Sequence, residues 1–264
     1  MVKALYLEFK FGDYDWPLLK NSGANEVIIP LETLTRQRLD QLKDCGFKMG
    51  ISIDSFASRC PADPQATNEL KNKLKQALDW KPQRIWLDGF RFGGYWETKG
   101  NKIKNIHEPC GWCKNKKRSD ILISVASSIR EILPWQLPLG YFAVPFKKEE
   151  KSEVVEILGQ DHFFLSQLFD FISPMIYHRM IGKSVSYISE YISYLKSMTG
   201  NTVIPILQTK DMPDNLPDQL SGKEMTKAFQ EAVKPPSVGV AWFSWDGAAE
   251  KKKAEIISKI FNST

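Results

Sequence analysis

The sequence lacks the patterns that mark several common classes of protein. It has no run of about 18 apolar residues, which excludes a transmembrane helix of ordinary length. It has no glycine-rich phosphate-binding loop, no nucleophile elbow of the G-x-S-x-G kind and no H-E-x-x-H helix. None of the sites that these motifs build is therefore expected. Internal repeats and low-complexity segments are also absent.

Cysteine and histidine are scarce, with four and three residues in a chain of 264, and no charged-then-apolar leader precedes Val2. We therefore expect a soluble protein, cytoplasmic by default, although removal of a leader before residue 1 would make it an exported one. The net charge of +5 arises from lysines lying among acidic residues, with the longest basic cluster at residues 114–118. This pattern is typical of a solvated surface, so we expect no nucleic-acid partner. The oligomeric state is left open.

Apolar runs alternate with amphipathic stretches along the chain, and 42% hydrophobic residues at this length can bury one large core. Strand-like runs occupy residues 2–9, 26–32, 48–56, 84–92, 139–144, 171–178, 202–209 and 238–246. Helical patterns occupy residues 16–21, 34–45, 68–80, 120–133, 184–198, 223–233 and 250–261, with a less regular stretch at 152–169. This alternation predicts an α/β fold, a single-domain (β/α)8 TIM barrel over residues 1–264. The long loop 93–118 after the fourth strand has the length of a lid or binding element.

Side chains alternate along a strand, so each barrel strand sends one set inwards and the other towards the helices. We expect small and polar residues near strand ends to line the barrel mouth, and bulky apolar residues to face the helices. The expected inward set is Tyr6, Glu8, Gly50, Ser52, Asp54, Gly89, Arg91, Gly93, Tyr141, Met175, Tyr177 and Gln208. Glu32 and Asp246 fall at rim positions. Asp88 shares the parity of Trp86, so we expect it to face outwards in a structural role.

Two acidic residues near the mouth have contrasting surroundings. Neighbouring barrel strands are neighbours in sequence, so Asp54 is expected beside Arg91, whose charge would lower the carboxyl pKa. Such a carboxylate suits a nucleophile or a charge stabiliser. A proton donor needs a partly apolar setting, and Glu97 beside Tyr95 and Trp96 fits that role. Alternatively, Asp54 and Arg91 form a structural ion pair that caps the barrel.

Aromatic residues are concentrated in the segments that should reach the mouth. Flat rings such as Trp96, Trp112, Trp242 and Trp245 can stack on sugars while their N–H groups find hydrogen bonds, or they can simply roof a wide barrel. The residues expected to bind substrate are Tyr6, Tyr95, Trp96, Tyr141, His178, Gln208, Trp242, Trp245 and Asp246. His162 has no partner pattern around it and is expected on a helix surface.

Cys110-Gly-Trp-Cys113 has C-x-x-C spacing and follows His107, and the loop after the third strand brings Cys60 to the same face. These four residues can build a Cys3His zinc site. A disulfide from Cys60 to Cys110 or Cys113 is an equal alternative, and free thiols are a third. In either bridged case the role is to pin the loop that carries Glu97. Cys45 ends a helix and is expected in the core.

Short motifs resemble known barrel glycosidases. Asp88-Gly-Phe-Arg-Phe92 resembles the strand-four region of α-amylase-type enzymes, and its Asp-Gly opening is similar to the D-G-x-D-x-D-x-E motif of chitinase-type enzymes. The amylase nucleophile would fall on Gly93 and the chitinase acid on Tyr95. The segments Ser173-Pro-Met-Ile-Tyr-His178 and Ala241-Trp-Phe-Ser-Trp-Asp246 resemble the Met-x-Tyr strand and the terminal sugar-stacking tryptophan of chitinase-type barrels.

The resemblance implies a glycoside hydrolase acting on an oligo- or polysaccharide at the C-terminal mouth of the barrel. Glu97 is the expected acid/base, Asp54 or Glu8 the nucleophile or water activator, Arg91 the orienting cation, and Tyr177 a hydrogen-bond donor to the sugar. No cofactor is expected, a structural zinc aside. One alternative is a non-catalytic carbohydrate-binding barrel. Another is a metal-dependent hydrolase such as a deacetylase, based on His107, His178 and the rim acids.

Overall fold

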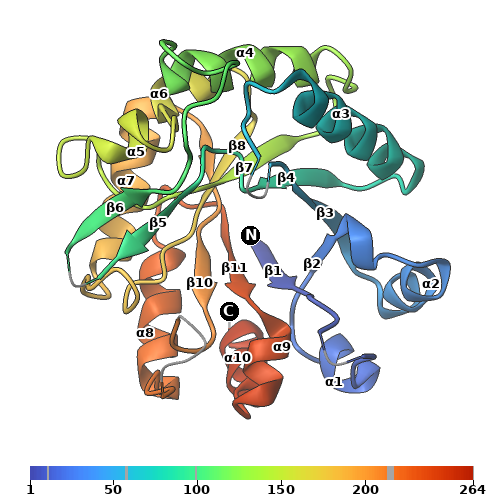
Figure 1. Cartoon of the computed structure of the whole chain (residues 1–264). Coiled ribbons are helices and arrows are strands. Elements are labelled where there is room, and N and C mark those ends of the chain that lie inside the picture. Colours follow the sequence, from blue (N-terminus) through green and yellow to red (C-terminus); the bar gives the residue numbers. More distant parts are fainter. Residues whose placement is uncertain (11, 57–58, 99, 213–216, 264) are drawn as a thin grey trace.

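The structure is a computed structural model that describes residues 1–10, 12–56, 59–98, 100–212 and 217–263. Its main sheet is parallel, in the order β10, β11, β1, β2, β3, β4, β7, β8, β9. The strands are β1 (Val2–Tyr6), β2 (Glu26–Pro30), β3 (Lys48–Asp54), β4 (Arg84–Asp88), β7 (Leu139–Ala143), β8 (Phe171–Pro174), β9 (Thr202–Val203), β10 (Ile206–Gln208) and β11 (Gly239–Phe243). Figure 1 shows the helices in a ring around these strands.

The seventh predicted strand is divided into two segments, β9 and β10, which pair with opposite neighbours and so close the sheet. β9 pairs with β8, whereas β10 pairs with β11. Pro205 lies between the two segments and has no N–H to donate, although its carbonyl accepts from Ala241 N at 2.9 Å. A bridge between Met175 and Ile206 also joins the end of β8 to β10, so the strands close into a ring. The predicted (β/α)8 TIM barrel is therefore confirmed.

The helices are α1 (Trp16–Lys20), α2 (Arg36–Cys45), α3 (Pro64–Asp79), α4 (Arg118–Arg130), α5 (Glu153–Glu156), α6 (His162–Leu165), α7 (Tyr187–Thr199), α8 (Gly222–Ala232), α9 (Trp245–Glu250) and α10 (Ala254–Asn262), with a 3-10 turn η1 at Leu31–Thr33. Side chains fix several helix starts, because they accept the N–H groups left free in the first turn. Asp63 accepts from Gln65 N at 2.9 Å, and Ser244 from Gly247 N at 3.1 Å. The cap at Ser244 explains why the eighth strand ends at Phe243, before its predicted end at 246. No helix among the described residues has the length and apolar character needed to cross a membrane.

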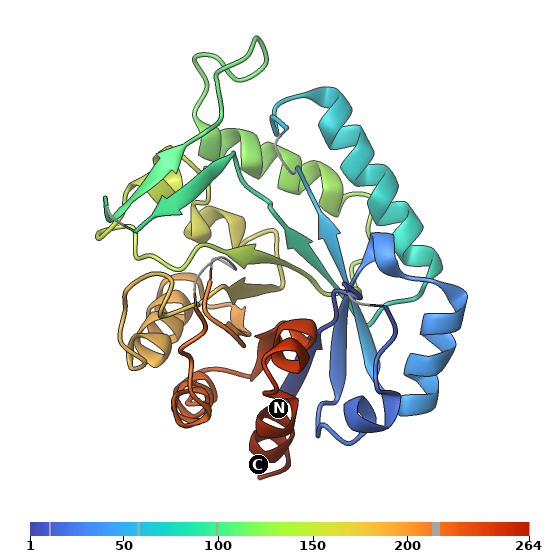
Figure 2. The same ribbon diagram turned by 60° about the horizontal axis from the view of Figure 1, so that its bottom comes forward.

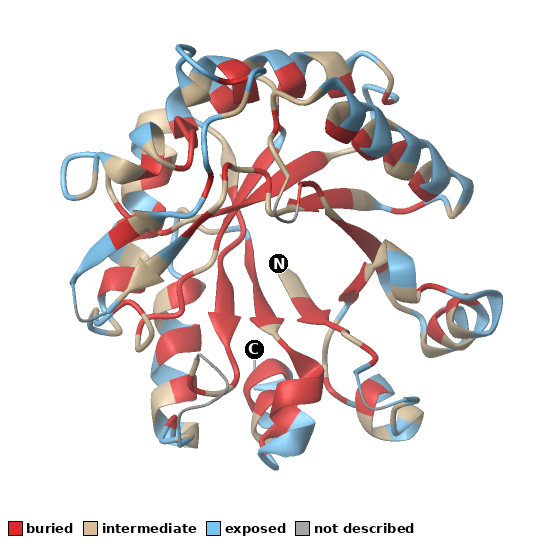
Figure 3. Ribbon diagram, viewed as in Figure 1, coloured by how far each residue is buried: buried red, intermediate tan, exposed pale blue. Residues whose placement is uncertain are grey.

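Two hydrophobic clusters separate the inside of the barrel from its helix layer. The inner cluster contains Tyr6, Trp86, Phe142 and Phe171, whereas the outer one joins the other face of the strands to the helices. In Figure 3 the barrel strands are mostly buried, while the helices expose their outer faces. Trp86 and Phe171 fill the barrel, with ring centroids 5.1 Å apart.

Glycines opposite these rings make this filling possible. A Cβ on Gly50 would lie 2.1 Å from Cζ3 of Trp86, and one on Gly140 would lie 2.2 Å from the Phe171 ring. Close packing leaves no space for such a group without movement of the rings. The expectation that Trp86 faces the helices was therefore wrong, because the missing side chain at Gly50 provides space inside the barrel.

The insertion after β4 forms an antiparallel hairpin of β5 (Gly94–Glu97) and β6 (Lys102–Asn105). Figure 2 shows this hairpin lying beside the barrel strands, and the chain continuing from it through a long loop to α4. The predicted loop 93–118 is thus partly regular, and its residue 99 lies outside the described part of the chain.

The contact between Gly50 and Trp86 predicts a defined cost of adding a methyl group. Gly50→Ala is expected to lower the free energy of unfolding by about 1–3 kcal/mol, because the methyl must displace a close-packed ring. Urea unfolding followed by circular dichroism measures this loss. In a double-mutant cycle with Trp86→Leu, the two losses are expected to be less than additive, since the smaller side chain leaves room for the methyl. Additive losses would show that Gly50 does not accommodate Trp86.

Candidate functional site

Polar groups from several strands meet at the C-terminal mouth of the barrel. Tyr6 at the end of β1 donates its hydroxyl to Ser52 Oγ on β3 at 3.2 Å. Asp54 follows Ser52 on the same inward face, and it pairs in register with Asp88 of β4. Tyr177, just after β8, belongs to the same inner cluster as Tyr6. The structure thus places Tyr6, Asp54 and Tyr177 inwards, as expected.

Asp88 is the acidic residue that the sequence analysis misplaced. It lies two residues after the inward Trp86, so the alternation along β4 directs it into the mouth rather than towards the helices. Its Oδ1 accepts from Gly89 N at 2.7 Å. Burial raises the pKa of Asp88, and the charge of Asp54 adds to this effect, while the Gly89 amide and Arg91 oppose it. Asp88 therefore has the electrostatic setting of a proton donor.

Gly89 lies beside both carboxylates, and the backbone changes direction at this residue. Its φ of +61° is a left-handed conformation that favours glycine, and a Cβ there would lie 3.3 Å from Asp54 Oδ1. The reversal after Asp88 places Phe90 and Phe92 in the outer cluster. Both acidic side chains consequently lie beside Gly89.

Arg91 also belongs to this region, as expected, but its charge interacts with Asp88, whereas Asp54 was the expected partner. Its Nη1 donates to the Gly94 carbonyl at 2.7 Å, which fixes the start of the β5–β6 hairpin. Burial lowers the pKa of Arg91, and the negative charge of Asp88 opposes that shift. Arg91 therefore links the hairpin electrostatically to Asp88, where the sequence had suggested Asp54.

Glu8 extends the acidic group on the side of β1. Its Oε2 accepts a hydrogen bond from Ser244 Oγ, and its backbone N donates to Asp246 Oδ2 at 2.8 Å. Asp246 is buried and also accepts from Lys10 N at 3.0 Å and from the Tyr14 hydroxyl. Asp246 thus holds the backbone after β1 in place, and its expected role in sugar binding stays a prediction.

A small pocket of about 210 Å³ adjoins this mouth. Arg91 and Tyr177 line it from the barrel, and Tyr95 and Trp96 line it from the hairpin. The Trp96 ring packs on Phe146 with centroids 4.4 Å apart. The pocket is below the roughly 300–1,000 Å³ of typical ligand sites, so it would hold only part of a longer ligand. A larger hollow of about 690 Å³ lies between α3 and α4 in the helix layer, away from these carboxylates.

Three aromatic residues that were expected in the mouth face the helix layer instead. Tyr141 bonds through its hydroxyl to His162 Nδ1 at 2.8 Å, and Trp242 and Trp245 are almost fully buried in the outer cluster. The inward positions on the same strands belong to Phe142, next to Gly140, and to Phe243, next to Ala241. Gly140 lies against the Phe171 ring and Ala241 belongs to the inner cluster, so the small residues mark the inward face of both strands, and parity judged by polarity alone was wrong here.

Phe243 is an aromatic residue of the mouth that the sequence analysis missed. Its ring lies 5.0 Å from the Tyr6 ring and stacks on Tyr177 at 5.8 Å. It is only partly buried, whereas Trp242 is fully buried. The alternation from Gly239 through Ala241 was the available signal, because it leaves Phe243 on the inner face.

His178 and Gln208, which were expected to bind substrate, form hydrogen bonds with neighbouring groups of the protein. His178 is buried and bonds through Nε2 to Glu224 of α8 at 2.9 Å. Gln208 accepts from Arg179 N at 3.3 Å and donates to the Lys210 carbonyl at 2.9 Å. His162, expected at the surface, is buried against Tyr141, and this burial lowers its pKa to about 4. These contacts stabilise the loops behind the mouth.

Glu97 lies at the end of β5 in the hairpin. Its Oε1 forms an ion pair with Lys104 of β6, and its register partner on that strand is Lys102. Tyr95, two residues earlier, is about half exposed. The structure therefore places Glu97 among hairpin lysines, separately from the mutual contacts of Asp54, Asp88 and Gly89.

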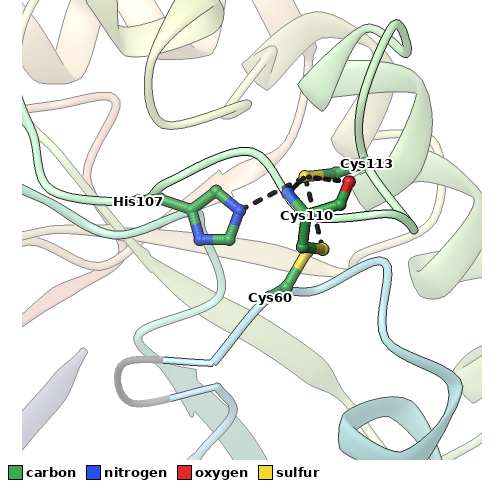
Figure 4. A group of neighbouring side chains, drawn as sticks. All are labelled: Cys60, His107, Cys110 and Cys113. Atoms are coloured by element: carbon green, nitrogen blue, oxygen red, sulfur yellow. Dashed lines mark hydrogen bonds between the residues drawn. The ribbon is translucent and has the colours of Figure 1, made fainter.

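The cysteine and histidine residues singled out by spacing do converge. Figure 4 shows Cys60, from the loop before α3, beside His107, Cys110 and Cys113, from the loop between β6 and α4. One side-chain donor atom from each of the four lies within 4.8 Å of the others. Burial lowers the pKa of His107, and the charge of Arg118 lowers it further. The four residues form one compact donor cluster between two loops of the mouth.

No protein-family model matches the chain, and no curated protein matches it in sequence. Solved structures do match its fold. The glycoside hydrolase domain of PgaB (BpsB) from Bordetella bronchiseptica superimposes with a TM-score of 0.69 at 10% identity, covering 99% of both chains. A family 18 chitinase from Cycas revoluta, in complex with (GlcNAc)3, gives a TM-score of 0.64 at 10% identity over 99% of this chain and 100% of that one.

A D-psicose 3-epimerase also matches, with a TM-score of 0.55 at 10% identity over 100% of this chain and 98% of that one. Proteins of different activity therefore share this architecture, and similarity at this identity concerns the fold. The chain has the TIM-barrel fold that glycoside hydrolases of the chitinase type also have.

Proposed function

We propose that the protein is a glycoside hydrolase that cleaves an oligo- or polysaccharide at the C-terminal mouth of its barrel. The observation that carries this proposal is the pair Asp54 and Asp88, adjacent in register, with burial raising the pKa of Asp88. Glycosidic cleavage uses two acidic residues, one protonated and one ionised, and environment separates their roles. The barrels of PgaB and the Cycas chitinase support the same reaction class.

Asp88 is the proposed general acid in this scheme. Its protonated carboxyl donates a proton to the glycosidic oxygen as the bond to the anomeric carbon breaks. Asp54 or Glu8, in ionised form, stabilises the positive charge that develops on the sugar or activates the attacking water. Tyr177 donates a hydrogen bond to the sugar, and Arg91 orients Asp88 and the hairpin.

The acid role passes from Glu97 to Asp88 for an electrostatic reason. Glu97 lies in the hairpin and has Lys104 as its ion-pair partner, whereas Asp88 lies at the end of a barrel strand, in register with Asp54. A proton donor needs a setting that raises its pKa, and burial provides it at Asp88. Glu97 then serves to hold the hairpin that presents Tyr95 and Trp96.

Aromatic rings supply the proposed sugar contacts. Phe243, stacked on Tyr177, offers a partly exposed ring beside the carboxylates, and Trp96 lines the adjoining pocket. Sugar rings have apolar faces that pack on such side chains. A chain of sugars can therefore run from the carboxylates into the pocket. Chito-oligosaccharides are the first substrates to test, because the Cycas chitinase binds (GlcNAc)3.

A non-catalytic carbohydrate-binding barrel is the second candidate. Gly93 and Tyr95 occupy the positions where the families it resembles carry a catalytic acid. A metal-dependent hydrolase has less support, because His178 pairs with Glu224. Among the described residues, His107 joins the cysteine cluster, the one group of histidine, cysteine and acidic side chains close enough to hold a metal.

Loss of the proposed acid has a defined expected effect. Asp88→Asn is expected to lower kcat/KM by about 10²–10⁴-fold, the usual contribution of general acid catalysis, while circular dichroism stays unchanged. Activity is measured on chito-oligosaccharides and a broad glycan panel. Glu97→Gln is the matched control and is expected to retain most activity. A larger loss in Glu97→Gln would return the acid role to Glu97, and a wild type that binds glycans but cleaves none would identify a binding module.

The pH dependence of activity provides a separate prediction. A general acid works in its protonated form, so kcat/KM is expected to fall as the pH rises through the pKa of Asp88. Asp54→Asn removes a negative charge that raises this pKa, so the alkaline limb should move to lower pH. Arg91→Met removes a positive charge that lowers it, so the limb should move to higher pH.

Residual activity against pH measures both shifts, and carbon NMR of labelled aspartate carboxyls measures them where activity is too low. Glu97→Gln should leave the limb in place. A limb that stays fixed in both the Asp54 and the Arg91 variants would exclude Asp88 as the titrating acid.

A further inference from the structure

The cluster of Cys60, His107, Cys110 and Cys113 is used by no step of the proposed reaction. Three thiols and one imidazole are the donor set of a structural zinc site, in which four protein ligands close the coordination sphere. We propose that these residues bind one zinc ion, and that this ion ties together two loops of the barrel mouth.

The distances within the cluster agree with tetrahedral coordination. Zinc lies about 2.3 Å from thiolate sulfur and about 2.0–2.1 Å from imidazole nitrogen, which places tetrahedral ligand atoms about 3.5–3.8 Å from one another. Cys110 Sγ lies 3.6 Å from Cys113 Sγ, and His107 Nε2 lies 3.3 Å from Cys113 Sγ. All four donor atoms lie within 4.8 Å of one another. A central ion therefore requires only small adjustments of side chains already in place.

A disulfide accounts for less of this arrangement. It would use two sulfurs and leave the third, together with the imidazole of His107, directed at the same point. His107 is buried there, with its ring 5.0 Å from that of Phe92. Buried polar groups need partners, and a metal ion satisfies all four donors at once.

The surroundings hold the donors in place and complement their charge. Arg118 donates from Nη2 to the His107 carbonyl at 3.2 Å and from Nη1 to Asn105 Oδ1 at 2.9 Å. Asn105 Oδ1 also accepts from His107 N at 3.0 Å, and Cys110 N donates to Cys113 Sγ at 3.2 Å. Zinc with three thiolates carries one net negative charge, which the neighbouring guanidinium offsets. Such outer contacts orient ligands and are a regular part of metal sites.

The position of the cluster gives the ion a structural task. Cys60 follows β3, which carries Asp54, whereas the other three ligands follow the hairpin that begins after Asp88 and Arg91. The ion would connect the loops of the two strands that supply the paired carboxylates. The hairpin residues Tyr95 and Trp96 are fixed by the same connection. This inference concerns metal binding and is independent of whether the protein cleaves sugars.

Metal content of the full-length protein tests the proposal. Protein expressed with added zinc and then dialysed is expected to contain about one zinc per chain by plasma mass spectrometry. Cys110→Ser and Cys113→Ser are each expected to lower this content at least about fivefold. Cys45→Ser is the matched control, because Cys45 lies outside the cluster at the end of α2, and it should keep one zinc. Cobalt exchanged into the wild type should show the visible absorption of a tetrahedral thiolate site.

Absence of stoichiometric zinc and cobalt would overturn the metal site, as would a Cys60, Cys110 or Cys113 disulfide found by mass spectrometry of unreduced peptides. The structural task is tested by removing zinc with a chelator and following limited proteolysis. Cleavage within residues 106–117 is expected to become faster, and zinc addition should reverse this change. Equal cleavage with and without zinc would overturn the proposed connection of the loops. These measurements use no glycan, so their failure is distinct from a failure of the hydrolase proposal.

Discussion

The packing of Trp86 into the space over Gly50 determines the arrangement of the mouth. β3 and β4 pair in register as Ser52 with Trp86 and Asp54 with Asp88. Once Trp86 fills the barrel, strand alternation requires Asp88 to face inwards as well. The absence of a side chain at residue 50 thus has a consequence four residues further along both strands, where two acidic groups meet. The packing of Trp86 against Gly50 therefore also determines where the two acidic side chains lie.

Asp54 and Asp88 would repel each other if both were ionised. Burial favours the neutral form of Asp88 and raises its pKa, and this shift reduces the repulsion. The hydrogen bond from the Gly89 amide, in contrast, favours the ionised form and opposes this shift. The left-handed turn at Gly89 then sends Arg91 back towards Asp88, where its charge moderates the shift. Burial, together with the local charges and the Gly89 amide, therefore determines the direction of the pKa shift of Asp88.

The sequence predicted the barrel because the alternation of strand and helix periods is a property of the whole chain. It also predicted the inward faces of β1 and β3, where polar and small residues share one parity. It failed on β4, β7 and β11, because the choice between Trp86 and Leu87, or between Trp242 and Phe243, depends on the space left by neighbouring strands. Such space is a tertiary property that one strand does not contain. The surroundings of Glu97 were likewise hidden in the sequence, because its ion-pair partner Lys104 lies on the other strand of the hairpin.

The cysteine cluster, in contrast, was predicted from the sequence, because the spacing of His107, Cys110 and Cys113 and the adjacent loop of Cys60 indicated one site. His107, Cys110 and Cys113 lie within seven residues, so one turn of the loop brings them together, and only Cys60 comes from another loop. In the proposed zinc site, Cys60 would therefore be the ligand that connects the two loops. Ordering a long insertion costs roughly 1–2 kcal/mol of backbone entropy per residue, and segments outside the hairpin have few ladder hydrogen bonds to offset it. The proposed ion would hold this insertion through three bonds and connect it to the loop before α3 through the fourth, to Cys60. Such a connection would offset part of the entropy cost of keeping the hairpin, and with it Trp96, beside the mouth.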